Sequence, residues 1–251
     1  MLRESVMKSA LTHETGFRWR GGEISRIEGF SDNVFGFALT LLVVSLEVPR
    51  TFIDLQSTLR GFIGFTFAFA LFFLFWYEHY KFFRRYGLND SVMLWLNAVF
   101  LFVILFFVYP LKFLISVLSR IFSGQSLTVT GSDGVPIPMI DPQQMVTLMV
   151  IYGIGSFLIF GLLTVMYRYA WSQRDALGLS ETERIITRGS IRSHTASLLI
   201  ALLSIAIAVI GGPSYTGWAG YTYCLIGPVQ AVLGYRNGKA MTAALGSSAD
   251  A

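Results

Sequence analysis

Residues 26–49 read RIEGFSDNVFGFALTLLVVSLEVP, and this stretch decides the class of fold. It is long and apolar enough for a membrane-spanning helix, yet it carries Glu28 and Asp32 near its start and Glu47 near its end. A carboxylate well inside a bilayer costs roughly 2.5 to 3.5 kcal/mol on insertion scales. The sequence therefore predicts that a partner on another helix compensates Asp32, and that this partner bears on function.

The composition of the whole chain indicates an integral membrane protein. Of its 251 residues, 54% are hydrophobic and 14% are charged, whereas about 25% are charged in an average soluble domain. The net charge of +4 does not indicate a nucleic-acid partner, because the basic residues fall in the gaps between apolar runs. Membrane lipid headgroups are their expected partners. The single cysteine, Cys224, excludes an intrachain disulfide.

Six segments are apolar over about the 20 residues that a bilayer crossing requires. The first four are expected at about 25–48, 55–80, 91–118 and 142–169. An uncharged run at 195–235 is too long for one crossing, and Gly211, Gly212 and Pro213 divide it into two helices joined by a tight turn. This division predicts an N-terminal polar segment at 1–24, a six-helix transmembrane domain at 25–240 and a disordered tail at 241–251.

The basic residues predict how the chain lies in the membrane. Cytoplasmic loops are enriched in Lys and Arg, and fifteen of the 19 such residues fall on the side that holds both termini. The opposite side has only Arg50, Arg60, Lys112 and Arg120. The sequence therefore predicts an all-α integral membrane protein of six transmembrane helices, with both termini in the cytoplasm.

Two connections and one glycine pair carry local predictions. Residues 123–141 are rich in Gly, Pro and Ser and are expected to form an exposed loop. In the linker before the fifth helix, Ser180 and Glu183 have the spacing of a capping box, which predicts a helix start. Gly153 and Gly155 predict a site of close packing between the fourth helix and its neighbours.

A helical wheel divides the first helix into faces. At 100° per residue, one stripe lies within about 40° of Phe37, with Thr40 at its edge; the other members are Arg26, Phe30, Asn33, Leu41, Val44 and Val48. Asp32 lies about 140° from this stripe, and Ser31 about 120° away on the other side. Because Arg26 and Asp32 are poorly spaced to pair, Asp32 is expected to find a donor on the second helix. His79 is the first candidate and Trp76 the second.

Two readings of Ser31 and Asp32 stay open at this point. Both side chains can form a buried polar clasp between helices, because polar groups inside a membrane must be satisfied internally. Asp32 can instead bind an ion or relay protons, as intramembrane carboxylates do in pumps and transporters. The expectation that buried charges are paired favours the clasp.

The run RIEGFSD at the start of the first helix resembles the signature of the transmembrane protein 175 family, the lysosomal potassium channels and their prokaryotic relatives. Three further runs resemble the same family: TLLVVSLEVP at 40–49, WYEHYKFFRR at 76–85 and LNAVFLFVILFFVYP at 96–110. Together the four runs cover roughly the first 110 residues. The six-span length matches the single-repeat prokaryotic branch and implies a prokaryotic plasma membrane.

The resemblance implies a homotetramer in which four first helices surround a pore for monovalent cations, with a modest preference for K⁺ over Na⁺. Phe37 takes the position of the narrow hydrophobic constriction, and Leu41 and Val44 follow on the same face. Thr40 matches the threonine linked to potassium preference. The family motif and its interhelical clasp correspond to Arg26, Phe30, Ser31, Asp32, Trp76 and His79.

This sequence departs from the family pattern at Phe37, where relatives usually carry Ile or Leu. A ring of four phenylalanines is bulkier, so a closed, dewetted gate is expected. Glu47 either adds a ring of carboxylates at the outer mouth or is an interfacial residue outside the pore. No cofactor is expected, and K⁺ is expected to pass Thr40 only transiently.

Other classes of function are weighed against the channel. A proton-coupled secondary transporter or proton-conducting carrier using Asp32 or His79 is the alternative, although the repeats and broken helices of carriers are not evident in the sequence. A non-conducting membrane scaffold is a third possibility. His13, His79 and His194 lack partners at metal-ligand spacing, and no nucleophile elbow or phosphate loop occurs. Neither a metal site nor an enzyme is therefore expected.

Overall fold

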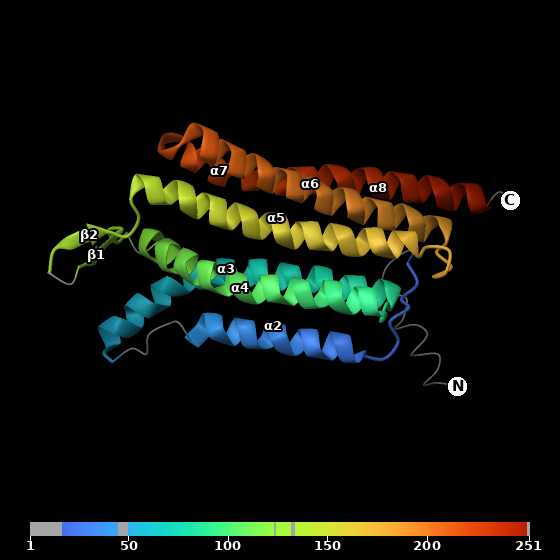
Figure 1. Cartoon of the computed structure of the whole chain (residues 1–251), viewed down its shortest axis with the longest axis horizontal. Coiled ribbons are helices and arrows are strands. Elements are labelled where there is room, and N and C mark those ends of the chain that lie inside the picture. The colour runs from blue at the N-terminus through green and yellow to red at the C-terminus, as the bar shows by residue number, and fades with distance from the viewer. Residues whose placement is uncertain (1–16, 45–49, 123, 132–133, 250–251) are drawn as a thin grey trace.

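The computed structural model describes residues 17–44, 50–122, 124–131 and 134–249 as a bundle of long helices that lie side by side (Figure 1). In this part of the chain, six helices have 19 or more residues: α2 Arg26–Val44, α3 Phe52–Tyr86, α4 Ser91–Phe122, α5 Pro142–Ser172, α6 Glu181–Gly211 and α8 Ile226–Ala249. Three of the described helices are long and apolar enough to cross a bilayer, namely Ser91–Ile121 within α4, α5, and α6.

Side-chain caps set where α5 and α6 begin. The Asp141 and Gln144 side chains form a capping box at the start of α5, where Pro142 occupies the first turn. At the start of α6, the backbone N–H of Glu183 donates to Ser180 Oγ (3.3 Å), and the Ser180 N–H donates to Glu183 Oε2 (2.8 Å). The capping box predicted at Ser180 is therefore confirmed.

The long apolar run breaks at the tight turn that the glycines and the proline predicted. α6 ends at Gly211, and Gly212 has φ 66°, a left-handed conformation that favours glycine. Three short helical segments follow, η1 Pro213–Tyr215, α7 Thr216–Tyr221 and η2 Thr222–Leu225, before α8 begins. The predicted tight turn is therefore confirmed. Gly212 alone separates α6 from the helical turn that Pro213 begins, and the hydrogen bond from Ser204 Oγ to Ala219 O (2.8 Å) shows that the chain returns along α6.

Two other regions, the end of α8 and the connection between α4 and α5, also differ from the sequence prediction. α8 continues to Ala249, through most of the segment 241–251 that composition predicted to be disordered. Its Met, Ala and Leu residues are good helix formers, which accounts for the extension. Residues 128–138 include two short antiparallel strands, β1 Thr128–Thr130 and β2 Pro136–Pro138, so the fold is not purely helical.

Close helix packing at the predicted glycines holds α5 against its neighbours. A methyl group at Gly155 would lie 1.5 Å from a Phe107 ring carbon of α4, and one at Gly153 would lie 2.3 Å from Ile205 of α6. Only hydrogen fits at either position. The predicted close-packing site is therefore confirmed, and it joins three helices.

The segment before α2 is fastened to the end of the bundle opposite the β1–β2 hairpin (Figure 1). Phe17 is 2% exposed and packs edge-on against Tyr86, with ring centroids 5.5 Å apart. Arg20 donates to both carboxylate oxygens of Glu183, at 2.9 and 2.7 Å, and its backbone N–H donates to Arg84 O (3.1 Å). The start of α2 is thus positioned by the C-terminal end of α3 and the N-terminal end of α6.

Candidate pore-lining helix

Helix α2 lies at one side of the bundle and packs only against α3 and α4 among the described long helices (Figure 1). The residues it buries recur every three or four positions: Glu28, Ser31, Phe35, Ala38 and Leu42. This spacing is that of one helical face. α2 therefore has a defined inner face and a defined outer face.

No helix in the described part of the chain covers the outer face of α2. Phe37 is 71% exposed, Phe30 62% and Leu41 43%. Arg26, Asn33 and Thr40 are exposed as well. We call these six residues the exposed stripe: Arg26, Phe30, Asn33, Phe37, Thr40 and Leu41.

The exposed stripe contains the pore residues predicted from the sequence, as far as the structure describes them. The side chain of Val44 lies outside the described part, as do Glu47 and Val48, so their positions stay predictions. The Thr40 hydroxyl donates to Gly36 O of its own helix (2.9 Å). This bond uses the hydroxyl proton, so the lone pairs of the Thr40 oxygen can bind a partner outside the chain.

A chain of buried hydrogen bonds joins the inner face of α2 to both neighbouring helices. Ser31 Oγ donates to Ile27 O (2.8 Å) and accepts from Asn97 Nδ2 of α4 (3.0 Å). Asn97 Oδ1 lies 2.7 Å from His79 Nε2 of α3. Because an amide oxygen only accepts, His79 is the donor in this bond. Each of the three polar side chains is at most 3% exposed.

Asp32 has a different partner from the first candidate. Its Oδ1 accepts a hydrogen bond from Trp76 Nε1 of α3 (2.8 Å). His79 bonds Asn97 instead and stacks on Phe100, with ring centroids 5.5 Å apart. The expectation that His79 is the first partner of Asp32 was therefore wrong, and Trp76, the second candidate, takes that place.

The sequence analysis missed two residues of this site. Asn97 connects all three helices. It lies in the run 96–110 that resembles the family, but no role was predicted for it. Glu28 forms a capping box with Ser25, with bonds of 2.8 and 3.2 Å, and its Oε1 lies 3.7 Å from Arg84 Nε. The Ser-x-x-Glu spacing from Ser25 to Glu28 was a readable signal for that cap.

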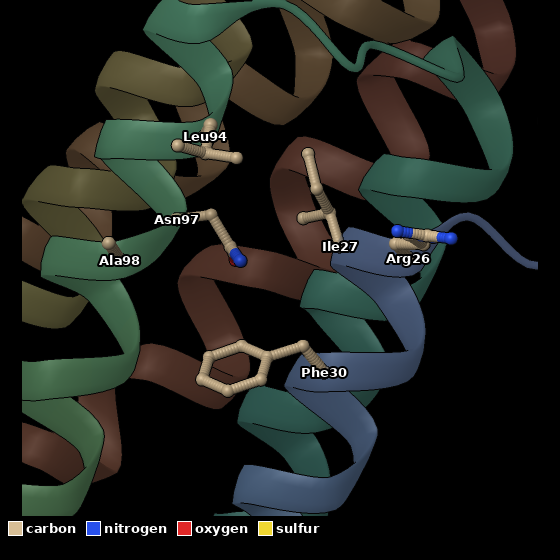
Figure 2. A pocket seen from close by; sticks show the side chains of 6 residues that line it. All are labelled: Arg26, Ile27, Phe30, Leu94, Asn97 and Ala98. Atoms are coloured by element: carbon tan, nitrogen blue, oxygen red, sulfur yellow. The ribbon is translucent and has the colours of Figure 1, made fainter.

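A pocket of about 310 Å³ lies at the seam between α2 and α4 (Figure 2). Its lining is Arg26, Ile27, Phe30, Leu94, Asn97 and Ala98. Figure 2 shows the Phe30 ring extending from α2 toward the α4 residues Asn97 and Ala98. Arg26 and Phe30 belong both to this pocket and to the exposed stripe, so the pocket borders the stripe at its basic end.

Comparisons with known proteins point to one family of channels. The profile of the family described as endosomal/lysosomal potassium channel TMEM175 matches residues 26–107, from the start of α2 into α4. A protein of Marivirga tractuosa named "Potassium channel" is 38% identical over 232 residues, which cover 91% of this chain and 94% of that protein. A potassium channel of Chamaesiphon minutus is 31% identical over 35% of this chain and 47% of its own length.

Two solved structures share the fold. A crystal structure of a variant of the potassium channel MtTMEM175 has a TM-score of 0.77 and 38% identity, covering 90% of this chain and 98% of that one. A lysosomal potassium-selective channel TMEM175 homolog from Chamaesiphon minutus has a TM-score of 0.54 at 20% identity, which shows a common fold alone. The match to the Marivirga protein extends over nearly the full length of both chains, and this chain belongs to the TMEM175 family.

Proposed function

We propose that this chain forms a potassium-preferring cation channel, a homotetramer in a prokaryotic plasma membrane, whose pore is lined by the exposed stripe of α2. The exposed stripe itself carries the proposal. It places Phe37 and Leu41 beside the polar Asn33 and Thr40 on a face that no other described helix covers. A surface of mixed polarity is poorly suited to lipid tails, whereas a narrow aqueous pore accommodates both kinds of side chain.

The Phe37 side chain is the proposed gate. Four copies around an axis would form an aromatic ring, with Leu41 and Val44 adding further apolar layers. Such a constriction blocks ions by excluding water rather than by charge. The bulk of phenylalanine, in place of the Ile or Leu usual in the family, favours the closed state.

Thr40 is the proposed contact for K⁺. Its hydroxyl proton is held by Gly36 O, so a ring of four Thr40 oxygens would present lone pairs to a passing cation. Because side-chain oxygens are fewer and more mobile than a cage of backbone carbonyls, the K⁺ over Na⁺ preference is expected to be modest. Glu47 is proposed to raise the cation concentration at the outer mouth.

The carrier alternative requires protons to move through Asp32 or His79. Asp32 is bonded to the indole N–H of Trp76, which donates but cannot accept a proton. No hydrogen bond links Asp32 to His79 in the described part of the chain. This arrangement counts against a proton relay and favours a clasp of which only the Ser31 part is buried, because Asp32 is exposed within the single chain. The relatives named above are channels rather than enzymes or carriers.

Reversal potentials of the purified protein in planar bilayers test the proposal. With a K⁺ gradient, we expect discrete currents that reverse toward the potassium equilibrium potential, and a smaller shift when Na⁺ replaces K⁺ on one side. Currents that reverse with the proton gradient would favour the carrier. Silence from demonstrably tetrameric protein, across pH and voltage, would reject the channel.

A further inference from the structure

A cluster of arginines surrounds Trp171 where α5 ends and α6 begins. The guanidinium carbon of Arg188 lies 4.4 Å from the centroid of the Trp171 ring, and that of Arg174 lies 5.2 Å from it. These cation–π contacts hold two arginines from different elements against one indole. The indole is half-buried and Arg188 is exposed.

Two more arginines lie about one turn further along the α5–α6 seam, toward the middle of the bundle. α5 and α6 run antiparallel, with Tyr167 packed on His194 (ring centroids 5.1 Å apart) and Trp171 packed on Arg188. Between these contacts, Arg168 on α5 and Arg192 on α6 are both exposed. Arg192 is one turn after Arg188, on the same face of α6.

The charge of this cluster is less compensated than that of other basic residues at this end of the bundle. Arg20 pairs with Glu183, Lys81 with Glu78 and Arg184 with Asp175, at 2.6 to 2.8 Å. In contrast, none of the salt bridges between described residues includes Arg168, Arg188 or Arg192. Three guanidinium groups thus face outward with their donors free for an external anion.

An apolar surface continues along the same seam toward the middle of the bundle. Val165 and Leu158 of α5 are 46% and 40% exposed, and Leu199 and Leu203 of α6 are 57% and 46% exposed. Both sets lie on the outward sides of helices that are long and apolar enough to cross a bilayer. The seam is therefore basic at one end and apolar beyond it, and the indole lies among the arginines of the basic end.

We propose that the α5–α6 seam is a binding site for one anionic phospholipid. The headgroup phosphate accepts hydrogen bonds from Arg168, Arg188 and Arg192, which guanidinium groups form readily with phosphate oxygens. Trp171 lies beside the headgroup, in the interfacial layer where indoles concentrate in membranes. The acyl chains follow the apolar surface of Val165, Leu199 and Leu203. This amphipathic pattern favours a phospholipid over a free phosphate ion, because the ion has no apolar part to contact the apolar surface.

Quenching of Trp171 fluorescence by brominated lipid tests the site directly. The full-length protein is placed in phosphatidylcholine vesicles that contain either brominated phosphatidylglycerol or brominated phosphatidylcholine. The signal of Trp171 is the difference between the unaltered protein and Trp171→Phe. We expect the anionic lipid to quench this signal at a mole fraction roughly tenfold lower than the zwitterionic lipid, since each basic residue near the surface favours anionic lipid several-fold.

Three variants separate this site from general attraction to the membrane. Replacing Arg168, Arg188 and Arg192 together with Gln is expected to abolish the preference, whereas replacing the three with Lys keeps most of it and shows that the fold tolerates change there. Arg236→Gln with Lys239→Gln, exposed on α8, is expected to leave the preference intact. Equal quenching by the two lipids in the unaltered protein, or a preference that survives the Gln triple variant, would overturn the site.

Inorganic phosphate distinguishes the lipid from a free anion. Excess phosphate is expected to change the quenching no more than chloride at equal ionic strength. If phosphate alone removes the anionic preference, the seam is an anion site rather than a lipid site and the proposal fails. None of these readouts depends on ion conduction.

Discussion

The inner and outer faces of α2 are made of similar residues but have opposite surroundings. The inner face buries Ser31 and Phe35, and the outer face exposes Asn33 and Phe37. On the inner side, hydrogen bonds join Ser31 of α2 to Asn97 of α4 and Asn97 to His79 of α3, whereas no described helix covers the outer face. The contrast shows that hydrophobicity alone does not orient this helix. Hydrogen bonds on one side fix its rotation, and that rotation determines what the other side presents.

Replacing Phe35 and Phe37 in turn is the strongest test of the difference between the buried and the exposed face of α2. Phe35→Ala removes a ring that is 2% exposed and packed on Phe72 and Phe100, so we expect a loss of about 3 to 5 kcal/mol in the free energy of unfolding. Phe37→Ala, at 71% exposure, is expected to change it by less than about 0.5 kcal/mol. Thermal unfolding in detergent measures both variants, and equal losses would contradict the assignment of the faces.

The same Phe37→Ala variant is expected to raise the basal current, because the aromatic ring no longer closes the constriction. Single-channel recording at equal protein density measures this effect. An unchanged current from folded protein at the surface would reject Phe37 as the gate while leaving the inner face unaffected.

Asn97 and Asn33 form a second matched pair. Asn97→Leu leaves both His79 Nε2 and Ser31 Oγ without their present partner, and an unpaired buried polar group costs about 1 to 3 kcal/mol. Asn33→Leu changes an exposed residue of the stripe and is expected to be nearly neutral for stability. If thermal unfolding shows the two variants to be alike, the buried network is not what holds α2.

The bond from Trp76 to Asp32 is expected to contribute less, since Asp32 is exposed within the single chain. A double-mutant cycle of Trp76→Phe and Asp32→Ala should give a coupling energy of about 1 kcal/mol in the free energy of unfolding. Trp95→Phe, at a position that is 69% exposed, is the matched control. A coupling indistinguishable from zero would mean that the two side chains meet without stabilising the helix pair.

Thr40→Val tests the role of the exposed face and makes the smallest structural change of these variants. The variant keeps the side-chain shape and removes only the oxygen that faces outward. We expect no measurable loss of stability and a K⁺ over Na⁺ permeability ratio that falls toward equality. Bi-ionic reversal potentials measure the ratio, and an unaltered value would show that selectivity resides elsewhere.

Several features of the fold could be predicted because they depend on short-range patterns. The Ser180 capping box, the break at Gly211 and the close packing at Gly155 each follow from residue type and local spacing. The helical wheel likewise separated Phe37 from Ser31 with no tertiary information, since a helix has a fixed turn angle.

The remaining features depend on which side chains meet across the bundle. Trp76 and His79 lie on the same helix less than one turn apart, so sequence spacing does not decide which of them reaches Asp32. Asn97 was missed because its two partners lie 18 and 66 residues away along the chain. Arg20 reaches Glu183 over 163 residues, which no local pattern could indicate.

Thiol modification of two exposed positions on α2 tests the central claim most directly. In a Cys224→Ser background, Thr40→Cys places a thiol on the exposed stripe, and Val43→Cys places one at a residue that is 44% exposed but about 120° from Phe37. If the stripe lines the pore, a cationic methanethiosulfonate reagent blocks the potassium current of Thr40→Cys and leaves that of Val43→Cys unchanged. Block of Val43→Cys alone, or of neither variant despite confirmed labelling, would contradict a pore lined by this face of α2.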